Sequence, residues 1–329
     1  MDIALLIVLI LVLIAEFTNG WTDAPNSIAT VVSTQALTPM QAIIMAGFFN
    51  ALGAALSGTA VAYTVGTEFI KLEFITLTTI GAAMFSLILW SALNALWGMP
   101  VSKSHALLAS LTGAGFATGG VEALLSSGWI KVMIGLSFSS IVGFLGGLLI
   151  MTAVYWIFRK TSLRKVKGLF RFLQIFSSAF VSFSHGSNDG QKIMGVFSLT
   201  LLIGGIIPSF YVPLWVIMLC ALMIGLGTLI GGWEILKTVG FKITHLDTSQ
   251  GFAAESAAAS IIFLASRFGI PLSTTHTINF AIMGVGSTKN LSAVRWGVTT
   301  QIFSSWIITF PFTACVAYVI TITLQWLGL

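Results

Sequence analysis

The sequence is poor in charge. Only 8% of its 329 residues are Asp, Glu, Lys or Arg, whereas a soluble domain has about 25%. Hydrophobic residues make up 57%, more than a soluble fold of this size could bury. The alternating ten-residue strands of an outer-membrane barrel are also absent. The composition therefore predicts an all-α polytopic membrane protein.

Cysteine is nearly absent as well, and so are the common signatures of catalysis. Cys220 and Cys315 lie inside apolar runs, which argues against a disulfide framework or a metal cluster. No HExxH or GxSxG pattern occurs, so we expect neither an enzyme nor a cofactor.

The positive net charge of +5 comes largely from one stretch. Six of the fifteen basic residues lie between residues 159 and 171, which contain no acid. A short basic loop between membrane segments is typical of the cytoplasmic side. We therefore expect residues 159–171 to form a cytoplasmic loop, and we expect no nucleic-acid partner.

Matched landmarks indicate an internal repeat. Three pairs keep nearly one offset: Asp23 and Asp189 (166 residues), Pro39 and Pro208 (169 residues), and Pro100 and Pro271 (171 residues). We expect two homologous repeats of opposite topology, residues 1–158 and 172–329, with about 10–12 membrane segments between them. Each repeat would contain a broken helix (3–37 and 172–207) and a re-entrant hairpin (100–127 and 271–290), because the apolar runs after Pro100 and Pro271 are too short to span a bilayer.

The first duplicated motif is Pro-x-Ser-x-Ser/Thr-His, at residues 100–105 and 271–276. Proline followed by hydroxyl residues is typical of a helix start, whose free N–H groups and dipole attract anions. The motif predicts an anion site, with ordinary N-capping as the alternative. Lys103 would assist the anion or extend to the interface, since the second copy has Thr there. The candidate anion ligands are Ser102, Ser104, Ser273, Thr274 and Thr275, and His105 and His276 would either carry protons or have a structural role.

The second motif is acidic. Ionisable groups at membrane depth cost about 2.5–3.5 kcal/mol each, so they persist mainly where they have a function or a partner. Asp23 with Asn26, supported by Thr22, offers oxygen ligands for Na⁺, while a proton would need only the carboxylate. In the second repeat Asn188 and Asp189 are followed by Lys192, not Asn. Lys192 either changes this half of the cation site or forms a buried pair with Asp189. The candidates for binding the coupling cation or completing the anion site are Asp23, Asn26, Asn188 and Asp189, with Na⁺ at Asp23, Asn26 and Asp189. Glu255 is an ion-coupling or structural carboxylate.

These residues resemble the PiT family of inorganic phosphate transporters, over nearly the whole chain. The resemblance rests on Gly20–Asn26 and Gly186–Asp189, which are similar to the family's Gly-x-Asn-Asp-x-x-Asn signature, on the two Pro-x-Ser motifs, on Gly227–Trp233, and on Gln250–Glu255. It implies a secondary active transporter of inverted-repeat architecture that works by alternating access. It also implies a homodimer in membrane lipid that imports phosphate with a coupling cation.

Two departures from the family pattern refine what the resemblance implies. Lys192 replaces the final Asn of the second signature, and the stretch His185–Lys192 is similar to the bacterial branch, which implies coupling to H⁺ or transport of metal–phosphate complexes. Na⁺ coupling stays open. We expect a multi-pass protein of a prokaryotic plasma membrane. A sulfate or other oxyanion permease of the same fold is the nearest alternative, and an anion channel is the alternative from another class.

Overall fold

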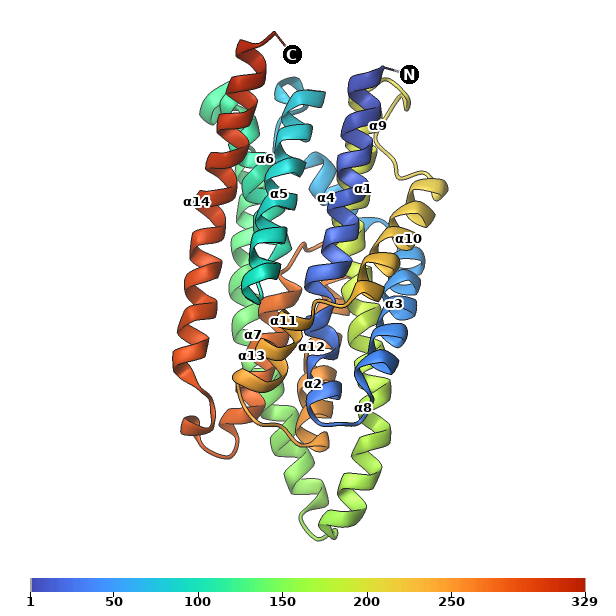
Figure 1. The fold of residues 1–329 in the computed structure, drawn as a ribbon, viewed down its shortest axis with the longest axis vertical. Coiled ribbons are helices and arrows are strands. Elements are labelled where there is room, and N and C mark those ends of the chain that lie inside the picture. The colour runs from blue at the N-terminus through green and yellow to red at the C-terminus, as the bar shows by residue number, and fades with distance from the viewer. Residues whose placement is uncertain (1, 329) are drawn as a thin grey trace.

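The computed structural model describes residues 2–328, and these are almost entirely helical (Figure 1). Apart from an isolated bridge between Ile70 and Leu124, this part of the chain has no β pairing. The all-α expectation is therefore confirmed. The α-helices are α1 Ile3–Asp23, α2 Pro25–Ser33, α3 Pro39–Leu56, α4 Ala60–Thr67, α5 Leu77–Trp97, α6 Lys103–Gly119, α7 Ser126–Phe158, α8 Leu163–His185, α9 Gln191–Ile203, α10 Leu214–Ile230, α11 Trp233–Lys237, α12 Thr248–Arg267, α13 Thr274–Ser287 and α14 Trp296–Trp326.

Five short turns complete the list of helical elements. Leu72–Phe74 (η1), Gly120–Ala123 (η2) and Leu291–Ala293 (η5) are 3₁₀ turns, while Gly186–Gly190 (η3) and Thr238–Lys242 (η4) are π turns. A π turn inside an α-helix is rare and frequently marks a functional site. The turn η3 coincides with the second acidic motif.

The helices include several that could cross a bilayer. Six helical stretches within residues 2–328 are long and apolar enough, and a seventh forms if α10 and the segment Trp233–Lys242, bent by 67°, are one span. The chain is thus a multi-pass membrane protein. The expected 10–12 segments exceed this number because that expectation counted short helices, such as α6 and α13, separately.

The two acidic motifs distort long helices without splitting them. α1 and α2 join at Ala24, which keeps helical angles (φ −56°, ψ −28°), and Ile3–Ser33 forms one span. α8, η3 and α9 likewise form one span, Leu163–Ile203. Proline at position 25 removes one N–H donor from the first helix, and the π turn inserts a wide turn into the second. The expected broken helices, 3–37 and 172–207, are therefore continuous spans with local distortions.

The two Pro-x-Ser motifs lie at the tips of helical hairpins. Gly98 (φ +64°) ends α5, and α6 follows from Lys103; Gly269 (φ +68°) follows α12, and α13 begins at Thr274. Glycine tolerates this left-handed conformation, which lets the chain reverse directly before each motif. The expected hairpin limits were 100–127 and 271–290. They begin at the tip and omit the preceding arm of each hairpin, α5 or α12.

The loop within the basic segment is shorter than expected. Residues 163–171 form the first turns of α8, so only residues 159–162 connect α7 to it. Leu163, Val166 and Phe170 recur at helical spacing among the basic residues, and Phe170 is buried, which explains why the helix begins early. In Figure 1 the α7–α8 connection projects beyond the other helices, at the end opposite both termini.

The two halves of the chain interleave. α1 packs on α10 and α3 packs on α8. Each hairpin also packs on the last helix of the other half, α6 on α14 and α13 on α7. Residues 1–158 and 172–329 thus do not form separate domains, and their two hairpin tips meet inside the molecule.

Candidate functional site

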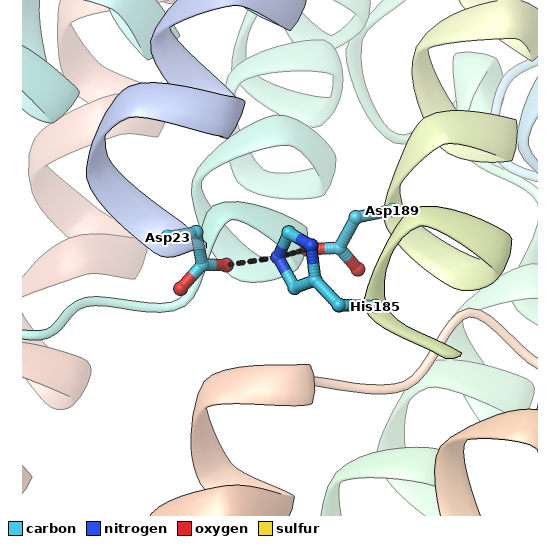
Figure 2. Close-up of side chains that lie close together, drawn as sticks. All are labelled: Asp23, His185 and Asp189. Carbon is cyan, nitrogen blue, oxygen red and sulfur yellow. Dashed lines mark ion pairs between the residues drawn. The ribbon is translucent and has the colours of Figure 1, made fainter. Parts of the chain in front are cut away.

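Three buried side chains converge where the two long spans are distorted (Figure 2). Asp23 ends α1, His185 ends α8, and Asp189 lies in η3. The Nε2 atom of His185 is 3.4 Å from Oδ2 of Asp189 and 3.9 Å from Oδ2 of Asp23. The structure therefore brings the two predicted aspartates together, with an imidazole between carboxylates that would otherwise repel each other.

A hydrogen-bonded chain fixes the orientation of His185. The Thr228 hydroxyl donates to the Ile224 carbonyl at 2.8 Å, so its oxygen accepts from Nδ2 of Asn50 at 3.2 Å. Oδ1 of Asn50 then faces Nδ1 of His185 at 2.8 Å. Nδ1 consequently carries a hydrogen, and Nε2 is directed at the carboxylates. Sequence reasoning assigned no role to His185, although its position four residues before Asp189 places both on one helical face. Nothing in the sequence indicated a role for Asn50.

The tip of the second hairpin contacts both aspartates. The Thr275 hydroxyl donates to Oδ1 of Asp23 at 2.5 Å, and the Thr274 hydroxyl lies 3.1 Å from Oδ2 of Asp189 and 3.5 Å from Oδ2 of Asp23. These two hydroxyls were predicted as anion ligands. In this conformation they hold the carboxylates in place.

Lys192 joins the acidic motif to both hairpins. Its ammonium donates to Oδ1 of Asp189 at 2.5 Å, to the Ser104 hydroxyl at 2.5 Å and to the Leu272 carbonyl at 2.8 Å. The structure contains the buried Asp189–Lys192 pair, which was one of the two roles that the sequence allowed for Lys192. The further contacts with Ser104 and Leu272 came from no sequence signal.

Hydroxyl groups also cap the helices at the tips and connect the tips to each other. Ser102 accepts from the backbone N–H of His105 at 3.3 Å, and Ser273 accepts from that of His276 at 3.2 Å. Ser104 donates to the Leu272 carbonyl at 2.9 Å. N-capping, the alternative from the sequence, therefore describes Ser102 and Ser273 in this conformation.

The two motif histidines pack together away from hydrogen-bonding groups. Their ring centroids are 4.6 Å apart, and His276 stacks on Trp306 at 3.6 Å. Neither ring hydrogen-bonds a protein group within residues 2–328, so backbone hydrogen bonding does not hold them. They line an apolar cavity of about 410 Å³ between α6, α7, α13 and α14. Aromatic packing positions them.

The remaining residues predicted for the cation site differ in what they contact. Nδ2 of Asn26 donates to Oδ1 of Asp23 at 2.6 Å, so Asn26 belongs to the site. The Thr22 hydroxyl instead bonds the Thr18 carbonyl of its own helix. Nδ2 of Asn188 donates to Ser266 and to the Ile270 carbonyl, at the turn after α12. Asn188 thus anchors the second hairpin to η3.

Two further carboxylates are fully buried. Glu255 accepts from Thr30 at 2.5 Å, from Gln174 at 3.2 Å and from Ser177, which ties α12 to α2 and α8. Glu16 is 0% exposed and has an oxygen without a partner. A Cβ added at Gly190 of η3 would lie 3.5 Å from Oε1 of Glu16, so Glu16 is close to the second acidic motif.

The Asp23–His185–Asp189 cluster has the dimensions of a single cation site. Each residue offers one ligand atom, and these atoms lie within 4.8 Å of one another. Oδ1 of Asn26 is buried and unpartnered beside them. Oxygen ligands suit hard cations, whereas an imidazole nitrogen suits a proton or a transition metal better. The cavity next to the cluster is only about 10 Å³, so this conformation is closed.

A closed polar site at the meeting point of two helical hairpins, enclosed by membrane spans, defines this chain as a helical membrane transporter. Comparison with known proteins gives the particular family. The Phosphate transporter family model matches residues 19–166 and again residues 159–317. The chain belongs to this family, and the double match agrees with two repeats.

Relatives and a solved structure agree with that assignment. The chain is 43% identical to a probable low-affinity inorganic phosphate transporter of Rhizobium meliloti, over 92% of this chain and 91% of the relative. It is 38% identical to a protein of the same description from Bacillus subtilis, over 95% and 96%. A solved structure of a sodium-dependent phosphate transporter aligns with a TM-score of 0.89 at 25% identity, covering 99% of this chain and 100% of that one. The chain is thus a multi-pass protein of a prokaryotic membrane.

Proposed function

We propose that this chain imports inorganic phosphate together with a cation by alternating access. The observation that carries the proposal is the pair of buried aspartates, Asp23 and Asp189, bound by the second hairpin tip. Buried carboxylates inside a membrane protein are costly unless they handle an ion. Relatives described as phosphate transporters, across nearly the full chain, support phosphate as the substrate.

The anion would bind between the hairpin tips. Thr274 and Thr275 would exchange their bonds to carboxylates for bonds to phosphate oxygens, while Ser102, Ser104 and Ser273 border the starts of α6 and α13. The positive ends of these helices favour an anion. Phosphate near neutral pH retains a proton that it can donate to a carboxylate, whereas sulfate has none. Nearby aspartates therefore favour phosphate over sulfate.

The cation would bind at Asp23, Asp189 and Asn26. The sodium-dependent structural neighbour supports Na⁺, and the imidazole of His185 between the carboxylates supports H⁺ or a metal–phosphate complex. Lys192 occupies the place that Asn26 has in the first half, so the second half would handle the cation differently.

Alternating access would use the two halves as inverted repeats. In Figure 1, α1 starts at the end that carries both termini and α8 starts at the opposite end, and the two hairpins approach the centre from opposite ends. The interleaved packing would let one hairpin withdraw while the other stays closed. Exposed apolar faces would contact lipid or the second subunit of a homodimer, which cross-linking in membranes would test.

Uptake of radioactive phosphate by proteoliposomes tests the proposal. Na⁺ and pH gradients are imposed separately, and sulfate is offered as a competitor. We expect concentrative uptake with one of the gradients, weak competition by sulfate, and loss of uptake in Asp23→Asn and Asp189→Asn. Glu234→Gln, at an exposed surface pair, is the control. Normal uptake by either aspartate variant would disprove its role, and flux that never exceeds equilibrium would indicate a channel.

A further inference from the structure

The first hairpin tip carries a lysine, Lys103, whose ammonium has neither a hydrogen-bond partner nor an ion-pair partner in the part of the chain that the structure describes. Lys103 is the first residue of α6 and is only 6% exposed. Within residues 2–328, its Nζ atom makes no hydrogen bond, and no carboxylate oxygen lies within the 4.0 Å of an ion pair. Lys192 shows the usual arrangement, since its buried ammonium has three acceptors. A charge on a largely buried side chain is costly unless it is paired, so the missing partner of Lys103 suggests a ligand.

Lys103 lines the small cavity beside the aspartates. Asn19, Asp189 and Lys192 form the polar part of the same wall. Oδ1 of Asn19 is buried and has no hydrogen-bond partner, and its amide nitrogen has only a long contact of 3.5 Å with Glu16. The cavity therefore combines the unpartnered Lys103 ammonium with the paired Lys192 and Asp189 side chains and an unpartnered amide oxygen.

The start of α6 contributes backbone donors at the same place. The first N–H groups of an α-helix have no acceptor within the helix. Here Ser102 accepts only from the N–H of His105. The donors of the first turn and Lys103, the first residue of α6, therefore belong to the same helix end. An anion is the ligand that this set of donors fits.

The second hairpin differs at the equivalent position. Thr274 is already bonded between the two aspartates, so its hydroxyl is occupied in this conformation. The two tips are thus unequal: the second holds the carboxylates, and the first holds a cationic group without a partner.

We propose that Lys103 is an anion-binding residue, and that phosphate binds first at the α6 tip, against its ammonium and the first-turn N–H groups. This inference rests on the proposed function and locates the substrate in it. The present cavity of about 10 Å³ holds one water-sized group, so the tip must separate from α1 and α9 to admit phosphate. As a fixed positive charge, Lys103 then offsets one negative charge of the phosphate, which a cotransported cation would otherwise have to offset.

Proteoliposomes with Lys103→Thr, which copies Thr274, and with Lys103→Arg test the assignment. We expect Lys103→Thr to raise the KM for phosphate at least about tenfold while Vmax changes by less than threefold. Lys103→Arg should remain within about threefold of wild type because it keeps the charge. Lys237→Met, which removes an exposed lysine, is the matched control and should be unchanged. An unchanged KM with a reduced Vmax or thermal stability would mean that Lys103 has only a structural role, and would overturn the proposal.

Chemical rescue separates charge from packing. Lys103→Cys is made in a Cys315→Ser background, since Cys315 is exposed and Cys220 is buried. Treatment with 2-aminoethyl methanethiosulfonate restores an ammonium at position 103, and the neutral methyl reagent does not. We expect only the first reagent to lower the KM for phosphate again, and equal effects of the two would refute the assignment. If wild type takes up no phosphate, the proposed function itself fails. If wild type does and these variants do not differ from it, only the role of Lys103 fails.

Discussion

Oδ1 of Asn50 lies 2.8 Å from Nδ1 of His185, and this single contact determines which imidazole nitrogen faces Asp23 and Asp189. We expect Asn50→Ala to reduce uptake by about 10–100-fold, the usual cost of removing a residue that orients a site histidine. The comparison of initial uptake rates, at equal protein in the membrane, checks this. Thr228→Val should give a smaller loss, since Asn50 keeps its bond to the imidazole. Asn290→Ala, an exposed site, is the control, and uptake equal to this control would contradict the role of Asn50.

The Asp189–Lys192 pair predicts a non-additive effect on stability. Lys192→Met leaves a buried carboxylate without its cation, which costs about 3–5 kcal/mol. We expect the double variant Asp189→Asn, Lys192→Met to be more stable than Lys192→Met alone, because neither member of the pair then stays charged. Thermal unfolding in detergent measures the difference. A double variant as unstable as the sum of the two single ones would show that the pair is not coupled.

Gly186 lies where η3 packs closely against α3. A Cβ at this position would lie 2.0 Å from the Asn50 carbonyl oxygen, so Gly186→Ala must separate the two helices and displace His185. We expect little folded protein, monitored by size-exclusion chromatography after solubilisation. Gly168→Ala is the matched control. It lies in α8 with no atom within 4 Å of the added Cβ and should stabilise the helix by about 0.5–1 kcal/mol.

Glu255 accepts enough hydrogen bonds from its neighbours to have a structural role. Glu255→Ala leaves the hydroxyls of Thr30 and Ser177 and the amide of Gln174 without their acceptor, at about 1–3 kcal/mol for each unsatisfied group. Glu255→Gln retains an oxygen acceptor, and the hydroxyls can reorient, so it should unfold close to wild type. If Glu255→Gln is stable yet inactive in phosphate uptake, the carboxylate charge itself is used in transport.

The sequence was informative wherever a single residue type dictates local geometry. Matched prolines and aspartates indicated the repeat, and the Pro-x-Ser motifs marked two helix starts that the structure contains. The sequence did not indicate which groups the hydroxyl side chains would contact. Thr275 bonds Asp23 from 252 residues away, and no local pattern distinguishes that contact from a helix cap. The early start of α8 was missed because its basic residues hide an apolar face that includes Phe170.

His185 and Lys103 show the same limit. Both were visible as ionisable residues in apolar surroundings, but their importance depends on neighbours from other helices. His185 becomes a bridge only because Asp23 is brought opposite Asp189. Lys103 becomes notable only because its ammonium makes no hydrogen bond or ion pair in the packed structure of residues 2–328. Such facts depend on tertiary packing, which a motif does not encode.

The interleaved packing has a consequence for synthesis in the membrane. Trp90 of α5 donates to Thr309 of α14, 219 residues later, and Ser86 bonds the Thr313 carbonyl, 227 residues later. The first hairpin therefore enters the bilayer long before its partner leaves the ribosome. Until then it must stay beside the translocation machinery or pack on a temporary neighbour, since its polar groups would face lipid. A ribosome stalled before residue 296 should hold the α5–α6 tip in a state open to proteolysis or cysteine labelling, and release of α14 should close it.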